Sequence, residues 1–270
     1  MSSASIIGDC RLCQKQNVNL CSSHLLPAAI ARWIRISNRH SGSSKGPIHV
    51  TTDSIFQKDY KIADYLLCRN CEDRFNNGGE LWVLDNTYRG SGRFQLQSAL
   101  RSLVNDGRAI VLSQTVTIIP SRAAQDIELE KLIYFAISVF WRAGAHLWKQ
   151  IDPNQISLGP YEEHLRLFLL AEALFPKSAA LVVNVTDSSK PFLAAAYPYS
   201  GRLEAVRQHR FSIPGIAFWL YLGRLPTAMT QLCAANVGVL CLAKNLDENM
   251  AREFQAVLLT NRQARHFKTR

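Results

Sequence analysis

Four cysteines arranged as two pairs are the residues of this chain best suited to chemistry. Cys10 and Cys13 form one C-x-x-C pair, and Cys68 and Cys71 form a second pair much later in the chain. A tight turn between two cysteines aims both thiolates at one point, and two such turns complete the tetrahedron that Zn²⁺ prefers. The sequence therefore predicts one structural zinc ion held by these four side chains.

The other three cysteines leave one alternative open. Cys21 and His24 follow the first C-x-x-C pair, so that pair and these two residues could form a Cys₃His site, which would leave the second pair without nearby partners. Cys233 and Cys241 lie in apolar stretches, and we expect them to be unreactive core residues. The chain starts without the segments of a signal peptide, so its seven cysteines favour metal binding over disulfides.

The charge balance favours an anionic partner. Lysine and arginine number 31 against 21 acidic residues, which gives a formal net charge of +10. Nucleic acid is the first candidate for such a partner, and an anionic membrane surface is the second. The hydrophobic content of 47% is ordinary for a globular protein. No apolar stretch reaches the ~18 residues that a membrane helix needs, so we expect a cytoplasmic protein without a membrane span.

Two segments of different composition must position the cysteines. Residues 1–92 are rich in cysteine and turns, and residues 93–270 are predicted to form a larger domain. In the first segment we expect a helix over residues 27–36 and a short apolar strand over residues 65–67. A further helix should begin at Cys71 and end at the glycine pair that follows it.

The second segment mixes helical and strand patterns. Its helix over residues 126–148 is apolar nearly all round, so we expect it to be buried. The predicted fold class is α+β, with helices packed on a small, mostly antiparallel sheet. Further helices are predicted over residues 94–103, 161–174 and 247–259, and strands over residues 109–119, 180–185, 192–197, 211–222 and 237–243.

Three motifs follow one another in the first segment: Cys10-x-x-Cys13, Ser23-His24-Leu25-Leu26-Pro27 and Leu67-Cys68-x-x-Cys71-Glu72. Their order resembles that of the HNH endonucleases, in which a treble-clef (ββα-metal) fold carries an Asp-His pair between two zinc-binding pairs. The resemblance covers about the first 80 residues of the chain. It implies an N-terminal zinc-bound treble-clef module, followed by the larger helix-and-sheet domain.

The resemblance also implies a reaction. His24 takes the position of the general base that deprotonates water for attack on a phosphodiester, assisted by Mg²⁺ or Mn²⁺. The chain departs from the family pattern at the cation, because Ser23 replaces the usual acidic residue and Glu72 replaces His or Asn. Asp64 and Glu72, with Glu80 as a third donor, offer the oxygen ligands that a hard cation prefers. The alternative is a catalytically inactive zinc module for nucleic-acid binding or protein assembly.

Basic residues near these motifs are predicted to contact phosphates, with DNA expected before RNA. A solvated basic surface is the alternative for the loop over residues 37–47. The larger segment could also form a homo-oligomer or bind a partner protein. The predicted phosphate-contacting residues are Arg32, Arg35, Arg39, Lys45 and Arg74, together with a basic tail that begins at Arg262.

Overall fold

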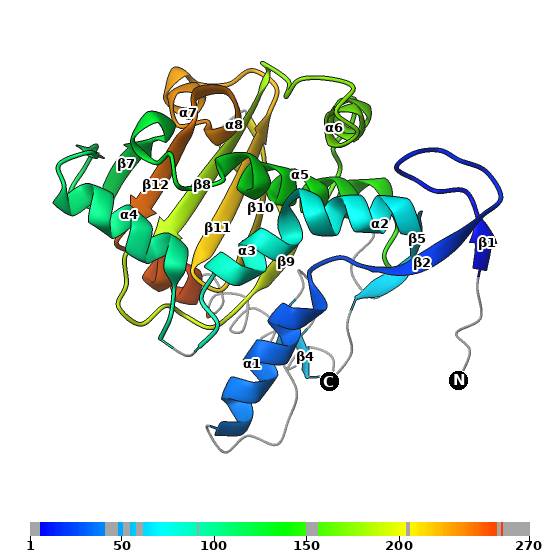
Figure 1. The fold of residues 1–270 in the computed structure, drawn as a ribbon, viewed down its shortest axis with the longest axis horizontal. Coiled ribbons are helices and arrows are strands. Elements are labelled where there is room, and N and C mark those ends of the chain that lie inside the picture. Colours follow the sequence, from blue (N-terminus) through cyan, green and yellow to red (C-terminus); the bar gives the residue numbers. More distant parts are fainter. Residues whose placement is uncertain are drawn as a thin grey trace, which may run out of the picture.

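A computed structural model describes the chain over residues 6–40, 48–50, 55–57, 62–90, 92–149, 156–203, 206–252 and 255. The fold is mixed α+β, as predicted, with a small sheet at one end and a large sheet at the other (Figure 1). Helices from both predicted segments pack between the two sheets. These helices determine where the candidate site lies.

The small sheet carries the residues of the predicted site. Its strand order is β1-β2-β5, and both pairings are antiparallel. Ser23 is paired with Asp64, and His24 with Ala63. The predicted helix after His24 is confirmed and continues to His40. The bounds are β1 (Ile6–Gly8), β2 (Val18–His24), α1 (Ala28–His40), β3 (Ile48–Val50), β4 (Ile55–Gln57) and β5 (Ala63–Cys68), with β3 and β4 forming a separate antiparallel pair.

One continuous helical run follows β5. It consists of α2 (Arg69–Phe75), the π-helical η1 (Asn76–Glu80) and α3 (Leu81–Asn86). The prediction that the glycine pair would end the helix is therefore wrong. Both glycines instead allow α5 (Leu129–Ala145) to pack closely against the helical run. A Cβ at Gly79 would lie 2.3 Å from the Lys131 carbonyl oxygen, and one at Gly78 would lie 2.6 Å from the Tyr134 ring. Glycine is required here by a close helix–helix approach.

The large sheet has the order β6-β7-β12-β8-β11-β10-β9, and only the β12–β8 pairing is parallel. In Figure 1, α5 lies across one face of this sheet. Phe135 and Phe140 of α5 meet Phe211 edge to face, with ring centroids 6.1 and 4.9 Å apart. The strands are β6 (Ile110–Val111), β7 (Val116–Pro120), β8 (Ala179–Thr186), β9 (Ala196–Leu203), β10 (Val206–Ile213), β11 (Ile216–Leu222) and β12 (Val239–Ala243).

Several predicted elements of the second segment have different bounds. The predicted strand over residues 211–222 is two strands, β10 and β11, because Gly215 turns the chain at a φ of +81°. The strand predicted over residues 109–119 is likewise the pair β6 and β7, and the strand predicted over residues 192–197 begins later, at Ala196. The helices are α4 (Gln95–Asn105), η2 (Ser121–Ala123), α6 (Tyr161–Leu169), α7 (Thr227–Gln231), α8 (Ala234–Val237) and a last one at 246–252.

Buried apolar side chains from both predicted segments form one continuous cluster. Helices α2 and α3 lie alongside α5, together with η1 (Figure 1). Phe75 of the helical run meets Trp141 and Tyr134 of α5 edge to face, each with ring centroids 6.1 Å apart. The small sheet is thus held against the large one through α5.

Candidate metal centre and its surroundings

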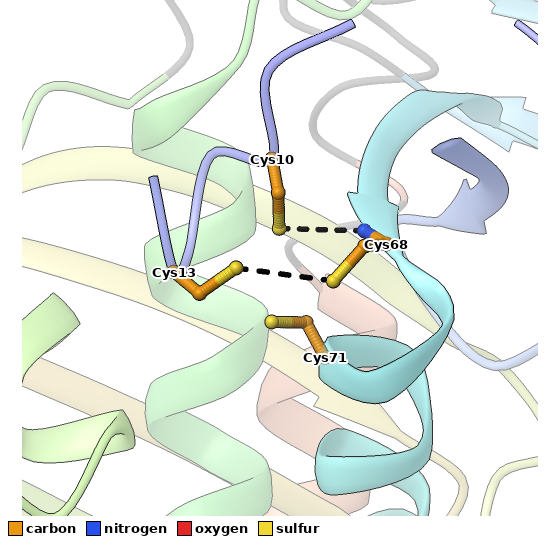
Figure 2. A group of neighbouring side chains, drawn as sticks. All are labelled: Cys10, Cys13, Cys68 and Cys71. Carbon is orange, nitrogen blue, oxygen red and sulfur yellow. Dashed lines mark hydrogen bonds between the residues drawn. The ribbon is translucent and has the colours of Figure 1, made fainter. Parts of the chain in front are cut away.

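The four predicted cysteines converge on one point. The Sγ atoms of Cys10, Cys13, Cys68 and Cys71 all lie within 4.8 Å of one another, and Figure 2 shows them turned toward a shared centre. Within the part of the chain that the structure describes, no other group of three or more His, Cys, Asp or Glu side chains is close enough to share a metal ion. Four thiolates around one centre suit a tetrahedral metal ion such as zinc.

Local backbone structure explains this convergence. The first pair lies in the turn between β1 and β2, where Gln14 has a φ of +58° and its N–H donates to the Cys10 carbonyl at 2.8 Å. Cys68 is the N-cap of α2 and Cys71 lies in the first helical turn. The Cys68 N–H donates to the Cys10 sulfur at 3.3 Å, which joins the two pairs directly (Figure 2).

Burial and mutual hydrogen bonding shift the pKa values of two cysteines in the cluster. Cys10 and Cys71 are only 1% and 4% exposed. Their mutual hydrogen bond lowers the pKa of Cys10 against the effect of burial, and together with burial it raises the pKa of Cys71. Four thiolates this close repel one another unless a metal ion neutralises them.

The remaining cysteines lie outside this cluster, so the alternative Cys₃His arrangement is not the one formed. Burial, followed by the Glu72 carboxylate, raises the pKa of Cys21. Cys233 and Cys241 are both buried in the core, and burial raises the pKa of Cys241 to about 12.

Arginines tie the cysteine-bearing elements to the helices of the second segment. The Arg11 guanidinium donates through Nη2 to the Ala145 carbonyl at 2.9 Å, at the end of α5. Arg166 of α6 donates to the Leu12 carbonyl, inside the first C-x-x-C turn, at 2.7 Å. The larger segment therefore supports the four-cysteine cluster through these hydrogen bonds.

The two positions at which the chain departs from the HNH pattern are in contact. Ser23, which is fully buried, donates a hydrogen bond from its hydroxyl to the Glu72 carboxylate in the first turn of α2. His24 is the last residue of β2, and its carbonyl accepts a hydrogen bond from Arg142 Nη1 at 2.6 Å. Glu72 is thus fixed next to the strand end that carries His24.

Asp64 is engaged by a residue that the sequence analysis did not select. Its Oδ2 lies 3.0 Å from His146 Nε2, and its Oδ1 accepts the Tyr65 N–H at 2.8 Å. Burial alone would raise the pKa of Asp64, but the hydrogen bonds from His146 and Tyr65 outweigh it and hold the pKa below its usual value. Asp64 is therefore a carboxylate bound to an imidazole.

Glu80 faces an arginine. Arg142 is 2% exposed, its Nη2 lies 3.7 Å from Glu80 Oε2, and its guanidinium stands 5.3 Å from the centre of the Phe75 ring. Burial raises the pKa of Glu80, Arg142 opposes that rise, and Glu72 adds to it. Asp64, Glu72 and Glu80 do not meet as one set of metal ligands among the described residues.

The predicted phosphate-contacting residues are only partly described. Arg32 is exposed on α1 and Arg35 is half-buried there. Arg74 is exposed on α2 and donates to the Leu170 carbonyl at 3.2 Å. Arg39 lies in α1, but its side chain is outside the described part, as are Lys45 and the basic tail.

Comparison with protein-family models, with curated proteins and with solved structures finds no match to this chain. In the described ranges, no helix combines the length and the apolar character needed to cross a membrane.

Proposed function

We propose that the first segment is a zinc-bound treble-clef module of the HNH type and that it hydrolyses phosphodiester bonds in nucleic acid. The observation that carries this proposal is the order of elements around the cysteines. A C-x-x-C turn leads into β2, β5 returns antiparallel, and α2 starts with the second pair. His24 ends β2, which is where the resemblance puts the general base.

In this reaction His24 accepts a proton from the water molecule that attacks phosphorus. Glu72 is the oxygen donor that the site would offer to Mg²⁺ or Mn²⁺, and a single carboxylate suits such ions because substrate phosphate commonly supplies further ligands. When bound, the cation supplies positive charge to the developing phosphorane. Asp64 has no part in binding it, because its oxygens are taken by His146 and Tyr65.

The substrate class follows from charge. The net charge of +10 and the exposed Arg32 on α1 favour a polyanion, and DNA is proposed before RNA. The proposed zinc ion is structural, since all four of its ligands are protein thiolates and no position is left open for substrate.

The test is cleavage of supercoiled plasmid DNA, and of RNA, by purified protein with Mg²⁺ or Mn²⁺. We expect nicking by the natural chain and a loss of about 10²-fold or more in His24→Ala, because removal of a general base has an effect of that order. Glu72→Gln should also lose activity, because it removes the carboxylate proposed to bind the cation. His164→Ala is the matched control, because this exposed histidine of α6 makes its hydrogen bond at 3.1 Å to the Pro160 carbonyl, at the start of its own helix. Undiminished cleavage by His24→Ala would remove His24 from the mechanism.

A second candidate is a non-catalytic module that binds nucleic acid. It is favoured by the Arg142 guanidinium, which already places a fixed cation beside Glu80, and by the Asp64–His146 pair. DNA binding that weakens steeply with salt, without cleavage under either metal ion, would select this candidate. Assembly with a partner protein or a second copy through the larger segment would show as a stable complex in light scattering.

A further inference from the structure

His146 and Asp64 form a carboxylate–imidazole pair outside the four-cysteine centre. Asp64 belongs to β5 and His146 is the C-cap residue of α5, so the fold brings together one residue from each of the two predicted segments. His146 Nε2 lies 3.0 Å from Asp64 Oδ2, and the two side chains are 22% and 24% exposed. The pair is thus both well defined and within reach of solvent.

Neighbouring groups fix the orientation of the pair. The Tyr65 N–H holds the second carboxylate oxygen at 2.8 Å. The His146 ring packs edge-on against Trp148, with centroids 5.0 Å apart, and Trp148 is itself buried and bonded through Nε1 to the Arg142 carbonyl at 3.0 Å. A carboxylate that engages Nε2 leaves Nδ1 for chemistry, and within the described ranges no hydrogen bond to Nδ1 is present.

The pair lies beside the proposed base. Asp64 is paired with Ser23, one residue before His24, and Arg142, four residues before His146, holds the His24 carbonyl. Adjacent residues of a strand point to opposite faces, so His24 and Asp64 flank the end of the β2–β5 ribbon from two sides. In-line displacement places base and acid on opposite sides of the phosphorus, so the substrate would have to lie across the end of this ribbon.

We propose that His146, oriented by Asp64, is the general acid of the phosphodiester hydrolysis proposed above, on which this inference rests. As water attacks, the new P–O bond forms and His24 takes the water proton. The bond from phosphorus to the leaving oxygen breaks, and the imidazolium of His146 gives its Nδ1 proton to that oxygen. Exchange with solvent then returns one proton to His146 and removes one from His24, so the net reaction is hydrolysis.

The charges around the pair suit an anionic substrate. The Lys149 ammonium is near enough to contribute to the lowered pKa of Asp64. The Arg11 guanidinium lies at the Ala145 carbonyl, one residue before His146. These cations would attract a phosphodiester, while the Asp64 carboxylate stabilises the positive charge of the imidazolium.

The competing role for His146 is purely structural, as a cap at the end of α5. Two substrates separate the roles. Plasmid DNA has an alkoxide leaving group that needs a proton, whereas the p-nitrophenyl ester of thymidine 5′-monophosphate releases p-nitrophenolate, which leaves unprotonated. Losing a general acid slows the first reaction selectively, and a disturbed fold slows both.

Both substrates should be assayed with the natural chain, His146→Gln, Asp64→Asn and the control His164→Gln. We expect His146→Gln and Asp64→Asn to cleave DNA about 10²-fold more slowly and the nitrophenyl ester within about threefold of the natural rate. His164→Gln should match the natural chain on both substrates. Thermal melting and zinc content confirm that each variant is folded.

The other outcomes overturn the inference in distinguishable ways. Equal losses on both substrates would assign His146 a structural role. Unchanged DNA cleavage by His146→Gln, with cleavage still dependent on His24, would reject the general acid but keep the nuclease. A natural chain that cleaves neither substrate would reject the nuclease and this role together.

Discussion

Replacing Arg142 by methionine should destabilise the protein more than any change at its surface ion pairs. The guanidinium is 2% exposed and makes contacts that no apolar side chain can replace, with the His24 carbonyl at 2.6 Å and the Glu80 carboxylate at 3.7 Å. Methionine fills much of the same space, so the loss is one of polar contacts rather than of volume.

The magnitude follows from those two contacts. A hydrogen bond from a charged donor contributes about 1.5–3 kcal/mol. Breaking a buried ion pair by removing one partner costs about 3–5 kcal/mol, and the 3.7 Å separation and the 16% exposure of Glu80 favour the low end. Since both costs share the same guanidinium, we expect a total of about 3–4 kcal/mol, or a fall of roughly 6–16 °C in Tm.

The loss of stability in Arg142→Met should depend on pH through the ionisation of Glu80. Burial raises the folded-state pKa of Glu80 above its ordinary value of 4.5, and Arg142 limits that rise. A raised folded pKa means that the folded state binds the proton more tightly, so this contribution to stability is full below pH 4.5 and is lost as pH rises through the folded pKa. Without Arg142 that pKa rises further, and the deficit of Arg142→Met should therefore grow from pH 4.5 toward pH 7.

The assay is urea unfolding of the natural chain and its variants between pH 4.5 and pH 7. Adding Glu80→Gln to Arg142→Met should remove the pH-dependent part of the deficit. Lys131→Met is the matched control, because Lys131 and Glu128 are closer, at 2.6 Å, but 38% and 52% exposed, so we expect a loss under about 1 kcal/mol. An Arg142→Met deficit below about 1 kcal/mol, or one that does not vary with pH, would refute the reasoning.

Two further predictions concern the metal centre and the helix contact. Purified protein should contain one zinc ion per chain by elemental analysis. Cys71→Ser should lose this zinc ion, and the control Cys233→Ser should keep it. Full zinc content in Cys71→Ser would exclude the four-thiolate centre. Gly79→Ala should lower the free energy of unfolding by about 1–3 kcal/mol, because its Cβ would meet backbone atoms of α5. As a control, Asn77→Ala at an exposed position of the same helical run should change the free energy of unfolding by less than about 0.5 kcal/mol. Equal melting of the two variants would contradict the packing argument.

Features set by local sequence were predictable. The two C-x-x-C pairs predicted the only cysteine cluster within the described residues, because each pair forms its own turn and needs only to be brought to the other. The apolar segment around Phe135 and Phe140 predicted the buried helix, since an all-round apolar pattern has no solvent face. The α+β class followed from the same periodicities.

Features set by distant contacts were not predictable. Glycine often ends a helix, so the local sequence predicts a helix end at Gly79. The helix continues because α5 packs directly against this glycine. Residues 211–222 have an apolar pattern typical of one continuous strand, but Gly215 turns the chain and makes them part of a hairpin. Asp64 and His146 are far apart in the chain, and nothing in the residues around either one indicates the other.

The predicted division into two segments at residue 92 also misses contacts between residues far apart in the chain, and these contacts lie at the candidate site. Arg142 and His146 both lie at the end of α5, in the larger segment, yet one holds the His24 backbone and the other holds Asp64. The motifs place the predicted metal ligands and catalytic residues in the first segment, because only that segment carries a family pattern. The contacts instead make α5 part of the candidate site. Perturbations of that helix should therefore affect the proposed cleavage even when the proposed metal ion is still bound.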